Sequence, residues 1–326
     1  MTYEPARKPT FYFIGVTTGQ SSIMTVFPLW ARHLGLGDVE MKGIDLALND
    51  RPERYREVVS FLKQDPLSLG ALVTTHKLDL FAAARDLFDE TDPYADLMAE
   101  TSCISKRDGR LMCHAKDPIS SGLAIGGFLP DRHFARTGAA VFSMGGGGAA
   151  SAITSHLMDP RRGDDRPSHI IVSDNSQDRL DHIRDIHARL KPDLAVEYVV
   201  VRKAEDNDRL LNGLAPRSLV VNATGMGKDR PGSPLSGSGT FPAQGIAWDL
   251  NYRGDLVFLD QARSQSTPLD LRIEDGWTYF IHGWTRVIAE VFNIEIPVSG
   301  PGFDTISRIA AEATGRLPAS GQIPAG

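Results

Sequence analysis

The chain has few of the residues from which disulfide frameworks and metal centres are built. It contains two cysteines, Cys103 and Cys113, in 326 residues, and two cysteines alone form neither a disulfide framework nor a metal site. Long apolar runs are missing too, because none approaches the roughly 18 residues that a membrane-spanning helix needs. The first residues, Met1 to Pro5, lack the charged-then-apolar pattern of a secretory signal. These absences predict a cytoplasmic protein with no metal ion and no membrane segment.

The chain also lacks an excess of positive charge. It has 35 lysines and arginines against 41 acidic residues, which gives a formal net charge of −6 at pH 7. With no long basic run, this balance argues against nucleic acid and anionic membranes as partners. The remaining composition, 41% hydrophobic and 23% charged, is ordinary for a globular protein, and the length suffices for two domains. We therefore expect a small-molecule substrate as the partner, and we leave a homodimer open.

What the sequence does contain is a glycine-rich stretch after an apolar segment. Residues 139–144 read Ala-Ala-Val-Phe-Ser-Met, and four glycines followed by alanines occupy residues 145–150. Glycine lets the backbone N–H groups of a helix N-terminus reach a pyrophosphate, since no Cβ stands in the way, and small residues let that helix pack close to the strand. The stretch predicts a strand, a turn and a helix that bind a dinucleotide, although glycine runs also occur in flexible linkers.

A second apolar strand ending in an acid supports this interpretation. Residues 168–174 read Ser-His-Ile-Ile-Val-Ser-Asp, and an acid at such a strand end accepts hydrogen bonds from the ribose of NAD. Further strands are expected at 196–201, 219–221 and 246–250, with helical segments between them, which predicts a doubly wound sheet. Residues 222–227 follow one of these strands and would face the cofactor. The Gly-, Ser- and Pro-rich segment 228–244 is predicted to be a mobile loop.

The N-terminal part also alternates strands and helices. We expect a strand at 11–16, a hydroxyl-rich loop at 17–22, and a helix whose buried face carries Ile23, Val26, Phe27 and Trp30. Another strand starts at residue 68 and ends in Thr74-Thr75-His76-Lys77, and a helix is expected at 78–88. Sheets of this kind bind ligands at the carboxyl ends of their strands, although any one of these residues alone is more often a solvated loop residue.

Two further segments complete the pattern. Residues 100–115 predict a hairpin with an Asp108-Gly109 turn, Asp117 stands just past its second strand, and a helix within 118–128 would lead to the next domain. Near the C-terminus, residues 275–284 lead into a helix that carries Val287, Ile288 and Val291. A last helix is expected at 304–316, before a tail that frays.

Taken together, these segments resemble the shikimate dehydrogenase family over nearly the whole chain and in the same order. Residues 15–24 match the family's N-terminal hydroxyl loop, 73–77 match the strand ending in its catalytic lysine, and 108–117 match the hairpin leading to its catalytic aspartate. The other landmarks of the family fall on residues 145–152, 222–224, 249–252 and 275–276.

The resemblance implies an α/β fold with two domains. Residues 1–122 would form an N-terminal α/β substrate-binding catalytic domain, and residues 123–275 a Rossmann-type, doubly wound NAD-binding domain. The C-terminal helices, within residues 276–326, would return to pack on the first domain. The implied activity is an NAD(P)-dependent dehydrogenase that reversibly oxidises a secondary alcohol.

The family's functional residues map onto named positions of this chain. Lys77 and Asp117 would be the catalytic pair: a buried lysine takes the proton of the substrate alcohol, the acid orients it, and hydride leaves the same carbon for the nicotinamide. A structural ion pair is the alternative. The implied substrate-binding residues are Ser21, Thr74, Ser102, Tyr252 and His282. The implied cofactor-binding residues are Gly145, Gly147, Gly148, Ala149, Asp174, Asn222 and Thr224.

Two histidines near these positions are open to more than one interpretation. We expect His76 at the surface, with a role as a base behind the site as the alternative. His282 either contacts the substrate or packs in the core. The cofactor is expected to be NAD rather than NADP, because Asp174 would repel a 2′-phosphate where NADP-using relatives place an arginine. Arg179, further along the chain, could still serve NADP.

Departures from the family pattern concentrate on the substrate side. Ile23, Ala71, Ser102 and Gly283 stand where the family has a serine, two asparagines and a glutamine. A site that hydrogen-bonds particular hydroxyls discriminates strongly, since buried polar groups are otherwise left unpaired. We therefore expect a cyclic polyol or hydroxy acid related to shikimate or quinate, and not shikimate itself. The alternatives are a true shikimate dehydrogenase and a ligand-sensing regulator without turnover.

Overall fold

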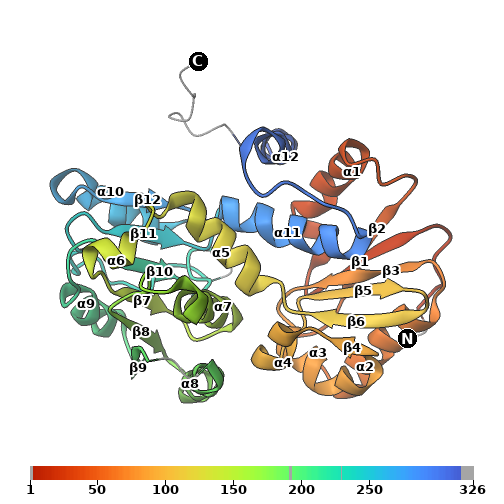
Figure 1. The fold of residues 1–326 in the computed structure, drawn as a ribbon, viewed down its shortest axis with the longest axis horizontal. Coiled ribbons are helices and arrows are strands. Elements are labelled where there is room, and N and C mark those ends of the chain that lie inside the picture. The colour runs from red at the N-terminus through yellow and green to blue at the C-terminus, as the bar shows by residue number, and fades with distance from the viewer. Residues whose placement is uncertain (1–2, 191–192, 229, 317–326) are drawn as a thin grey trace. The chain divides into compact units, whose positions relative to one another are not determined.

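The computed structural model describes residues 3–190, 193–228 and 230–316, and it divides the chain into two compact units (Figure 1). The first unit combines Met1–Lys116 with Ile281–Gly326, and the second is the continuous segment Asp117–Phe280. The expected boundary at residue 122 falls inside helix α5 (Asp117–Phe128), and the one at 275 falls just before helix α11 (Trp277–Phe292). Within the described ranges no helix is long and apolar enough to cross a membrane.

The first unit is built on a mixed sheet in the order β2-β1-β3-β5-β6-β4. Strand β1 pairs in parallel with β2 and β3, whereas β5 is antiparallel to both β3 and β6. The predicted hairpin is confirmed: β5 and β6 turn at Asp108 and Gly109, whose φ angles of 51° and 77° suit a type I′ turn. The strands are β1 (Thr10–Gly15), β2 (Glu40–Asp45), β3 (Ser68–Val73), β4 (Glu90–Thr91), β5 (Cys103–Arg107) and β6 (Arg110–His114).

Helices cover this sheet with the apolar faces that the sequence predicts. Ile23, Val26, Phe27 and Trp30 of α1 are buried, and the Trp30 indole donates a hydrogen bond to the Ile306 carbonyl of α12 at 2.9 Å. The helical elements are η1 (Thr18–Gln20), α1 (Ile23–His33), α2 (Pro52–Gln64), α3 (Lys77–Ala84), η2 (Arg85–Leu87), α4 (Pro93–Met98), the C-terminal part of α11, and α12 (Gly300–Ala313).

Some expected helix limits were wrong. Helix α3 begins at Lys77 and ends at Ala84, because the chain tightens there into the 3₁₀ turn η2. The segment expected to lead into α11 is already helical from Trp277, since the Asp275 carboxylate accepts from the Trp277 amide at 2.9 Å at the helix start. The last helix starts earlier than expected, at Gly300. The tail predicted to fray lies outside the described residues.

The second unit confirms the doubly wound prediction. Its six strands are all parallel, in the order β12-β11-β10-β7-β8-β9, so the chain moves outward from β7 to β9 and then returns to β10 on the other side of β7. This is the strand order of a Rossmann sheet, in which ligands bind where the winding direction changes. The strands are β7 (Val141–Met144), β8 (His169–Asp174), β9 (Ala195–Val200), β10 (Leu219–Asn222), β11 (Ile246–Asp249) and β12 (Arg272–Glu274).

Apolar side chains cover both faces of this sheet, as a parallel sheet between helices requires. Val141, Ile170 and Val221 belong to one buried cluster with residues of α5, α7 and α8, and Phe142 and Val220 belong to another with residues of α9 and α10. The helical elements are α5, α6 (His133–Thr137), α7 (Gly148–Met158), η3 (Pro160–Arg162), α8 (Gln177–Leu190), α9 (Ala204–Asn212) and α10 (Val257–Leu269).

Candidate functional site

The glycine stretch forms the turn between β7 and α7. Gly145 has φ +101°, and a Cβ at this position would lie 2.7 Å from the Ala223 carbonyl oxygen, so only glycine fits where the chain passes the end of β10. Gly147 is the N-cap of α7, and nothing lies within 4 Å of the position that its Cβ would take. The helix N-terminus therefore has the open, unhindered backbone that an anion requires.

Asp174 holds the glycine turn from the neighbouring strand. Its carboxylate accepts from the Gly146 amide at 2.7 Å and from the Ser176 amide at 2.8 Å. Arg179 lies nearby, with its Nη1 3.8 Å from Oδ2 of the same carboxylate. Asp174 is buried, so it fixes the turn as well as standing where the ribose contact is predicted.

The ends of β10 and β11 bring a second polar group to this edge. The buried Asn222 side chain accepts from the amide and the hydroxyl of Thr224, at 3.2 and 2.7 Å, and donates to Asp249 at 3.2 Å. Burial raises the pKa of Asp249 to about 6, against the hydrogen bonds from Asn251 and Asn222. The Thr224 amide nitrogen is 3.1 Å from the position of a Cβ on Gly145.

The structure thus gathers the predicted cofactor-binding residues at one edge of the second sheet. They end or follow β7, β8 and β10, and these strands are parallel and adjacent. The residues are Gly145, Gly147, Gly148, Ala149, Asp174, Asn222 and Thr224. Their contacts with a dinucleotide remain a prediction.

Several predicted substrate-side residues likewise share one edge of the first sheet. Thr74 follows β3, and its Oγ1 lies 3.0 Å from the position of a Cβ on Gly15, the last residue of β1. Ser102 precedes the antiparallel β5, and its carbonyl accepts from the Val73 amide at 3.0 Å. Lys77 begins α3 directly after this edge, and its carbonyl accepts from the Thr101 amide at 3.1 Å.

Ser21 lies in the hydroxyl-rich loop that leaves β1. Asp45, at the end of β2, anchors this loop by accepting from the amide and the hydroxyl of Thr18, at 2.8 and 2.6 Å. The Thr18 carbonyl in turn accepts from the Ser21 amide at 3.0 Å. Because β1 and β3 are parallel, this half-buried serine follows the same edge of the sheet as Thr74.

The surface placement expected for His76 was wrong. His76 is 1% exposed, and its Nδ1 lies 3.3 Å from the Tyr55 hydroxyl on α2. The chain turns at Thr75, which has φ +41°, and His76 then packs against α2. An imidazole can be buried there because the tyrosine hydroxyl provides a hydrogen-bond partner.

His282 is buried on α11, against α12. Its ring stacks on Phe303, with centroids 4.4 Å apart and an interplanar angle of 12°. Burial, and then the charge of Arg286, lowers the pKa of His282 to about 4. This environment is that of a packed neutral imidazole, and a substrate contact remains a prediction.

Asp117 and Tyr252 belong to the second unit, whereas Lys77 belongs to the first. Asp117 is the first residue of α5, and its carbonyl accepts from the Ser121 hydroxyl at 2.7 Å. Tyr252 packs against Phe280 and Trp277, with ring centroids 4.8 and 5.4 Å away. The pairing of Lys77 with Asp117 therefore stays a prediction.

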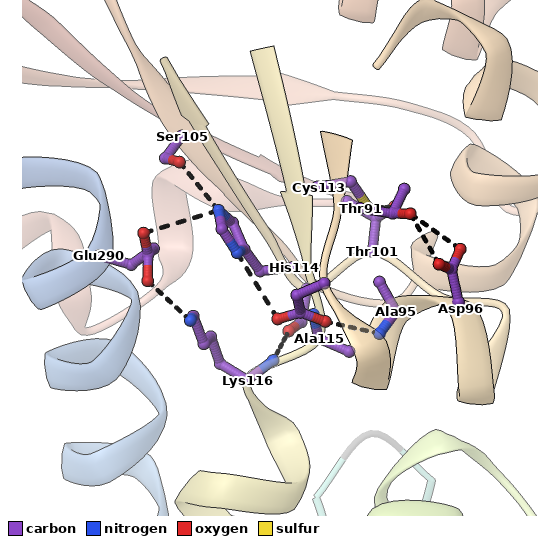
Figure 2. Close-up of polar contacts among 12 residues, drawn as sticks. Thr91, Ala95, Asp96, Thr101, Ser105, Cys113, His114, Ala115, Lys116 and Glu290 are labelled. Atoms are coloured by element: carbon purple, nitrogen blue, oxygen red, sulfur yellow. Dashed lines mark hydrogen bonds and ion pairs between the residues drawn. The ribbon is translucent and has the colours of Figure 1, made fainter. Parts of the chain in front are cut away.

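The structure also contains a charged cluster that was not predicted from the sequence, and Figure 2 shows its members Glu290, Lys116 and His114. Glu290 of α11 accepts from Arg107 at 2.7 Å and from Lys116 at 2.8 Å. His114 lies beside them, with its Nε2 2.9 Å from Ser105 Oγ and 3.7 Å from Glu290 Oε1. Burial favours protonation of Glu290, but the Lys116 hydrogen bond and the surrounding positive charges outweigh it, so the pKa of Glu290 is lowered.

This cluster fixes the segment that leads directly to Asp117. The Lys116 amide donates to Ser102 Oγ at 2.7 Å, and the Lys116 side chain reaches Glu290. Main chain and side chain are therefore both held at the residue before the predicted catalytic acid. The one available sequence signal was Glu290 itself, because it is the only acid in the otherwise largely apolar α11.

Comparison with known proteins points to one family in sequence and in fold. No protein-family model matches the chain. The chain is 26% identical over 185 residues to the shikimate dehydrogenase (NADP(+)) of Lactococcus lactis, and the match covers 56% of this chain and 60% of that protein. The matched segment therefore spans about three fifths of this curated relative.

Solved structures match almost the whole chain. The shikimate 5-dehydrogenase of Thermus thermophilus, solved with NADP(H) and shikimate, has a TM-score of 0.67 at 20% identity and covers 93% of this chain and 99% of its own. A 5-ketofructose reductase of Gluconobacter has a TM-score of 0.67 at 16% identity, covering 94% and 99%. The chain has the two-domain fold of shikimate dehydrogenases and is similar to them in sequence.

Proposed function

Because the chain has the shikimate dehydrogenase fold, we propose that it is a nicotinamide-dependent dehydrogenase. It would reversibly oxidise a secondary alcohol of a cyclic polyol or hydroxy acid. The observation that carries this proposal is that, within each unit taken by itself, predicted site residues lie together at the carboxyl ends of parallel strands. The first unit has Thr74, Lys77 and Ser102 there, and the second has the glycine turn.

Lys77 and Asp117 are proposed as the proton-transfer pair. The neutral Lys77 amine accepts the proton of the substrate hydroxyl, and the Asp117 carboxylate orients that amine. A bound nicotinamide supplies the hydride acceptor. The charged cluster at Lys116 supports the assignment of Asp117, because it holds the preceding residue in place.

The residues around the glycine turn fit a dinucleotide. The α7 N-terminus offers unhindered backbone amides to a pyrophosphate. We propose NAD as the cofactor, because the Asp174 carboxylate occupies the end of β8, where a 2′-phosphate would be repelled. Arg179, more than half exposed, supports NADP as the alternative, and so does the similarity to the Lactococcus enzyme, which is named a shikimate dehydrogenase (NADP(+)).

The substrate is proposed to differ from shikimate in its polar groups. Ile23 and Ala71 replace polar residues of the family pattern; both are fully buried, and their apolar side chains offer no hydrogen bond. The fold is also that of an enzyme named for 5-ketofructose, so it accommodates more than one polyol. The names of the other relatives favour shikimate itself as the second candidate.

Lys77→Ala tests the proposed chemistry. We expect turnover to fall by at least about a hundredfold, the usual contribution of a general acid–base, while the dissociation constant of the dinucleotide stays near that of the wild type. Lys63→Ala is the matched control, because Lys63 forms an exposed ion pair with Asp89. Equal loss of turnover and dinucleotide affinity in Lys77→Ala would contradict the assignment.

A substrate panel distinguishes the candidates. Shikimate, quinate, other cyclic polyols and hydroxy acids are each assayed with NAD and with NADP, following the formation of the reduced cofactor. Efficient oxidation of shikimate would support the second candidate. Thermal shifts with these compounds but no turnover on any of them would instead indicate a ligand-sensing protein.

A further inference from the structure

The second unit contains a pocket of about 360 Å³ at the edge of its sheet opposite the glycine turn. The pocket lies where strands begin: Arg217 precedes β10, Ile246 starts β11 and Arg272 starts β12, with α6 lining it as well. The glycine turn follows the carboxyl end of β7, which is parallel to these strands. The pocket is therefore separate from the predicted dinucleotide site.

Positive charge predominates in this pocket. Three arginines, Arg136, Arg217 and Arg272, line it together with a single acid, Asp131. Arg272 donates to Glu274 at 2.7 Å, whereas Arg217 Nε donates to the neutral Gln244 side chain at 3.0 Å. Among the residues that the structure describes, neither Arg136 nor Arg217 forms an ion pair with a carboxylate. In a chain of net charge −6, such a concave basic site concentrates anions.

The backbone beside the pocket is fixed at two of the residues that line it. Arg217 and Gln244 have φ angles of 66° and 55°, in the left-handed region that residues other than glycine rarely adopt. Main-chain hydrogen bonds hold both: the Arg217 amide donates to Ala243 and the Gln244 amide to Leu269, at 2.8 and 2.6 Å. These bonds hold the side chains of Arg217 and Gln244 at the pocket wall.

His133 connects α6 to the same loop without adding charge. Its Nε2 lies 2.9 Å from the Arg217 carbonyl oxygen, and the residue is buried. Burial lowers the pKa of His133 below its ordinary value and so favours the neutral ring. The positive charge of the pocket thus comes from the guanidinium groups alone.

We propose that this pocket binds a small multivalent oxyanion, either a polyphosphate or a polycarboxylate. Guanidinium groups pair with both classes through two parallel N–H donors, and the volume lies at the small end of the roughly 300–1,000 Å³ of ligand sites. Ile246 and Pro130 add apolar surface for the carbon skeleton of such a ligand. The site does not depend on the proposed dehydrogenase chemistry.

Isothermal titration calorimetry with inorganic pyrophosphate and with citrate, at constant ionic strength, tests the proposal on the full chain. The pocket variants are Arg136→Gln, which changes an exposed side chain on α6, and its combination with Arg217→Asn. Asparagine is chosen because it tolerates the left-handed conformation. The control is Arg32→Gln, because Arg32 is also exposed on a helix and forms no ion pair among the described residues.

We expect at least one of the two anions to bind the wild type and Arg32→Gln equally, and to bind the pocket variants at least tenfold more weakly. The anion that responds identifies the ligand class. The glycine turn is itself a predicted phosphate site, so pyrophosphate binding that Arg136→Gln and the double variant leave unchanged belongs there. The proposal would be overturned if the pocket variants bound both pyrophosphate and citrate as the wild type does. Absence of binding by both anions to the wild type would also overturn it.

Discussion

The buried carboxyl of Asp249 has a pKa well above the ordinary value of an aspartate. It is fully buried at the end of β11, and among the described residues its Oδ2 has no hydrogen-bond partner. Its Oδ1 accepts from the Asn251 amide at 2.9 Å and from Asn222. Because burial penalises the charged form more than these bonds favour it, the pKa rises to about 6.

The raised pKa predicts a specific pH dependence of stability. The folded protein holds the Asp249 proton up to about pH 6, whereas the unfolded chain releases it near pH 4. Raising the pH through this window therefore favours unfolding, by about 3 kcal/mol in total. Asp249→Asn cannot ionise, so the difference in unfolding free energy between wild type and variant should change by this amount between pH 4 and 7.

Urea unfolding at several pH values measures this difference. Asp260→Asn is the control, because Asp260 is exposed and paired with Arg263, and it should leave the pH dependence as it is in the wild type. If the wild type and Asp249→Asn respond identically to pH, Asp249 does not have a raised pKa.

Alanine substitution at two glycines of the same turn should have different effects on stability and on dinucleotide binding. A Cβ at Gly145 would meet a backbone carbonyl at a φ of +101°, whereas a Cβ at Gly147 meets nothing within 4 Å. Gly145→Ala should therefore destabilise the fold by about 1–3 kcal/mol. Gly147→Ala should change stability by less than about 0.5 kcal/mol and still weaken dinucleotide binding, since its methyl group would block the helix amides.

Urea unfolding and calorimetric titration of NAD measure the two effects separately. Unchanged NAD affinity in Gly147→Ala would mean that the pyrophosphate does not bind at this turn. Equal stability of the two alanine variants would contradict the close approach of Gly145 to Ala223.

At the scale of elements, α11 is joined to the β5–β6 hairpin by charge rather than by apolar packing alone. Glu290 accepts from Arg107 on β5 and from Lys116 just after β6, and these side chains are 38% and 13% exposed. A hydrogen bond to a charged group with this degree of burial contributes more than an exposed ion pair. The cluster therefore ties a C-terminal helix to the strands before Asp117.

Glu290→Gln should lower the unfolding free energy by about 1–3 kcal/mol, because it removes the carboxylate charge that pairs with Lys116 and Arg107 in a partly buried position. Thermal unfolding followed by circular dichroism measures the loss. The matched control is Glu312→Gln, in the exposed Arg308–Glu312 pair, which should cost less than about 0.5 kcal/mol. Similar losses in both variants would show that the cluster contributes no more than a surface pair.

Elements that follow local rules were predictable from the sequence, and contacts between distant segments were not. The strand and turn at Gly145 follow from an apolar run before glycines, and the hairpin follows from Asp108-Gly109. The two-residue β4 and three-residue β12 are too short to show alternation, and both were missed. Glu290 meets Lys116 and Arg107 across 174 and 183 positions of the chain, a distance over which no periodicity carries information.

At the scale of the whole molecule, the reactivity of the two cysteines can test whether the first unit is folded. Cys103 and Cys113 are fully buried free thiols. Burial raises the pKa of Cys113 to about 12 and that of Cys103 well above its ordinary value. Since the thiolate is the reactive form, both should react with a thiol reagent at least about a thousandfold more slowly in the native protein than in urea. Rapid labelling of the native protein would contradict this burial.

The first unit is assembled from the two ends of the chain, and this affects how it is made. Phe11 of β1 packs against Trp284 and Phe292 of α11, with ring centroids 6.4 and 5.8 Å away, and Trp30 bonds to Ile306 of α12. On a ribosome, all of the second unit is synthesised before these covering helices. We therefore expect the second unit to fold independently of these helices, while the N-terminal sheet keeps aromatic side chains exposed until the helices have been made. Because transiently exposed apolar surface aggregates, we expect chaperones to bind this sheet before the helices cover it.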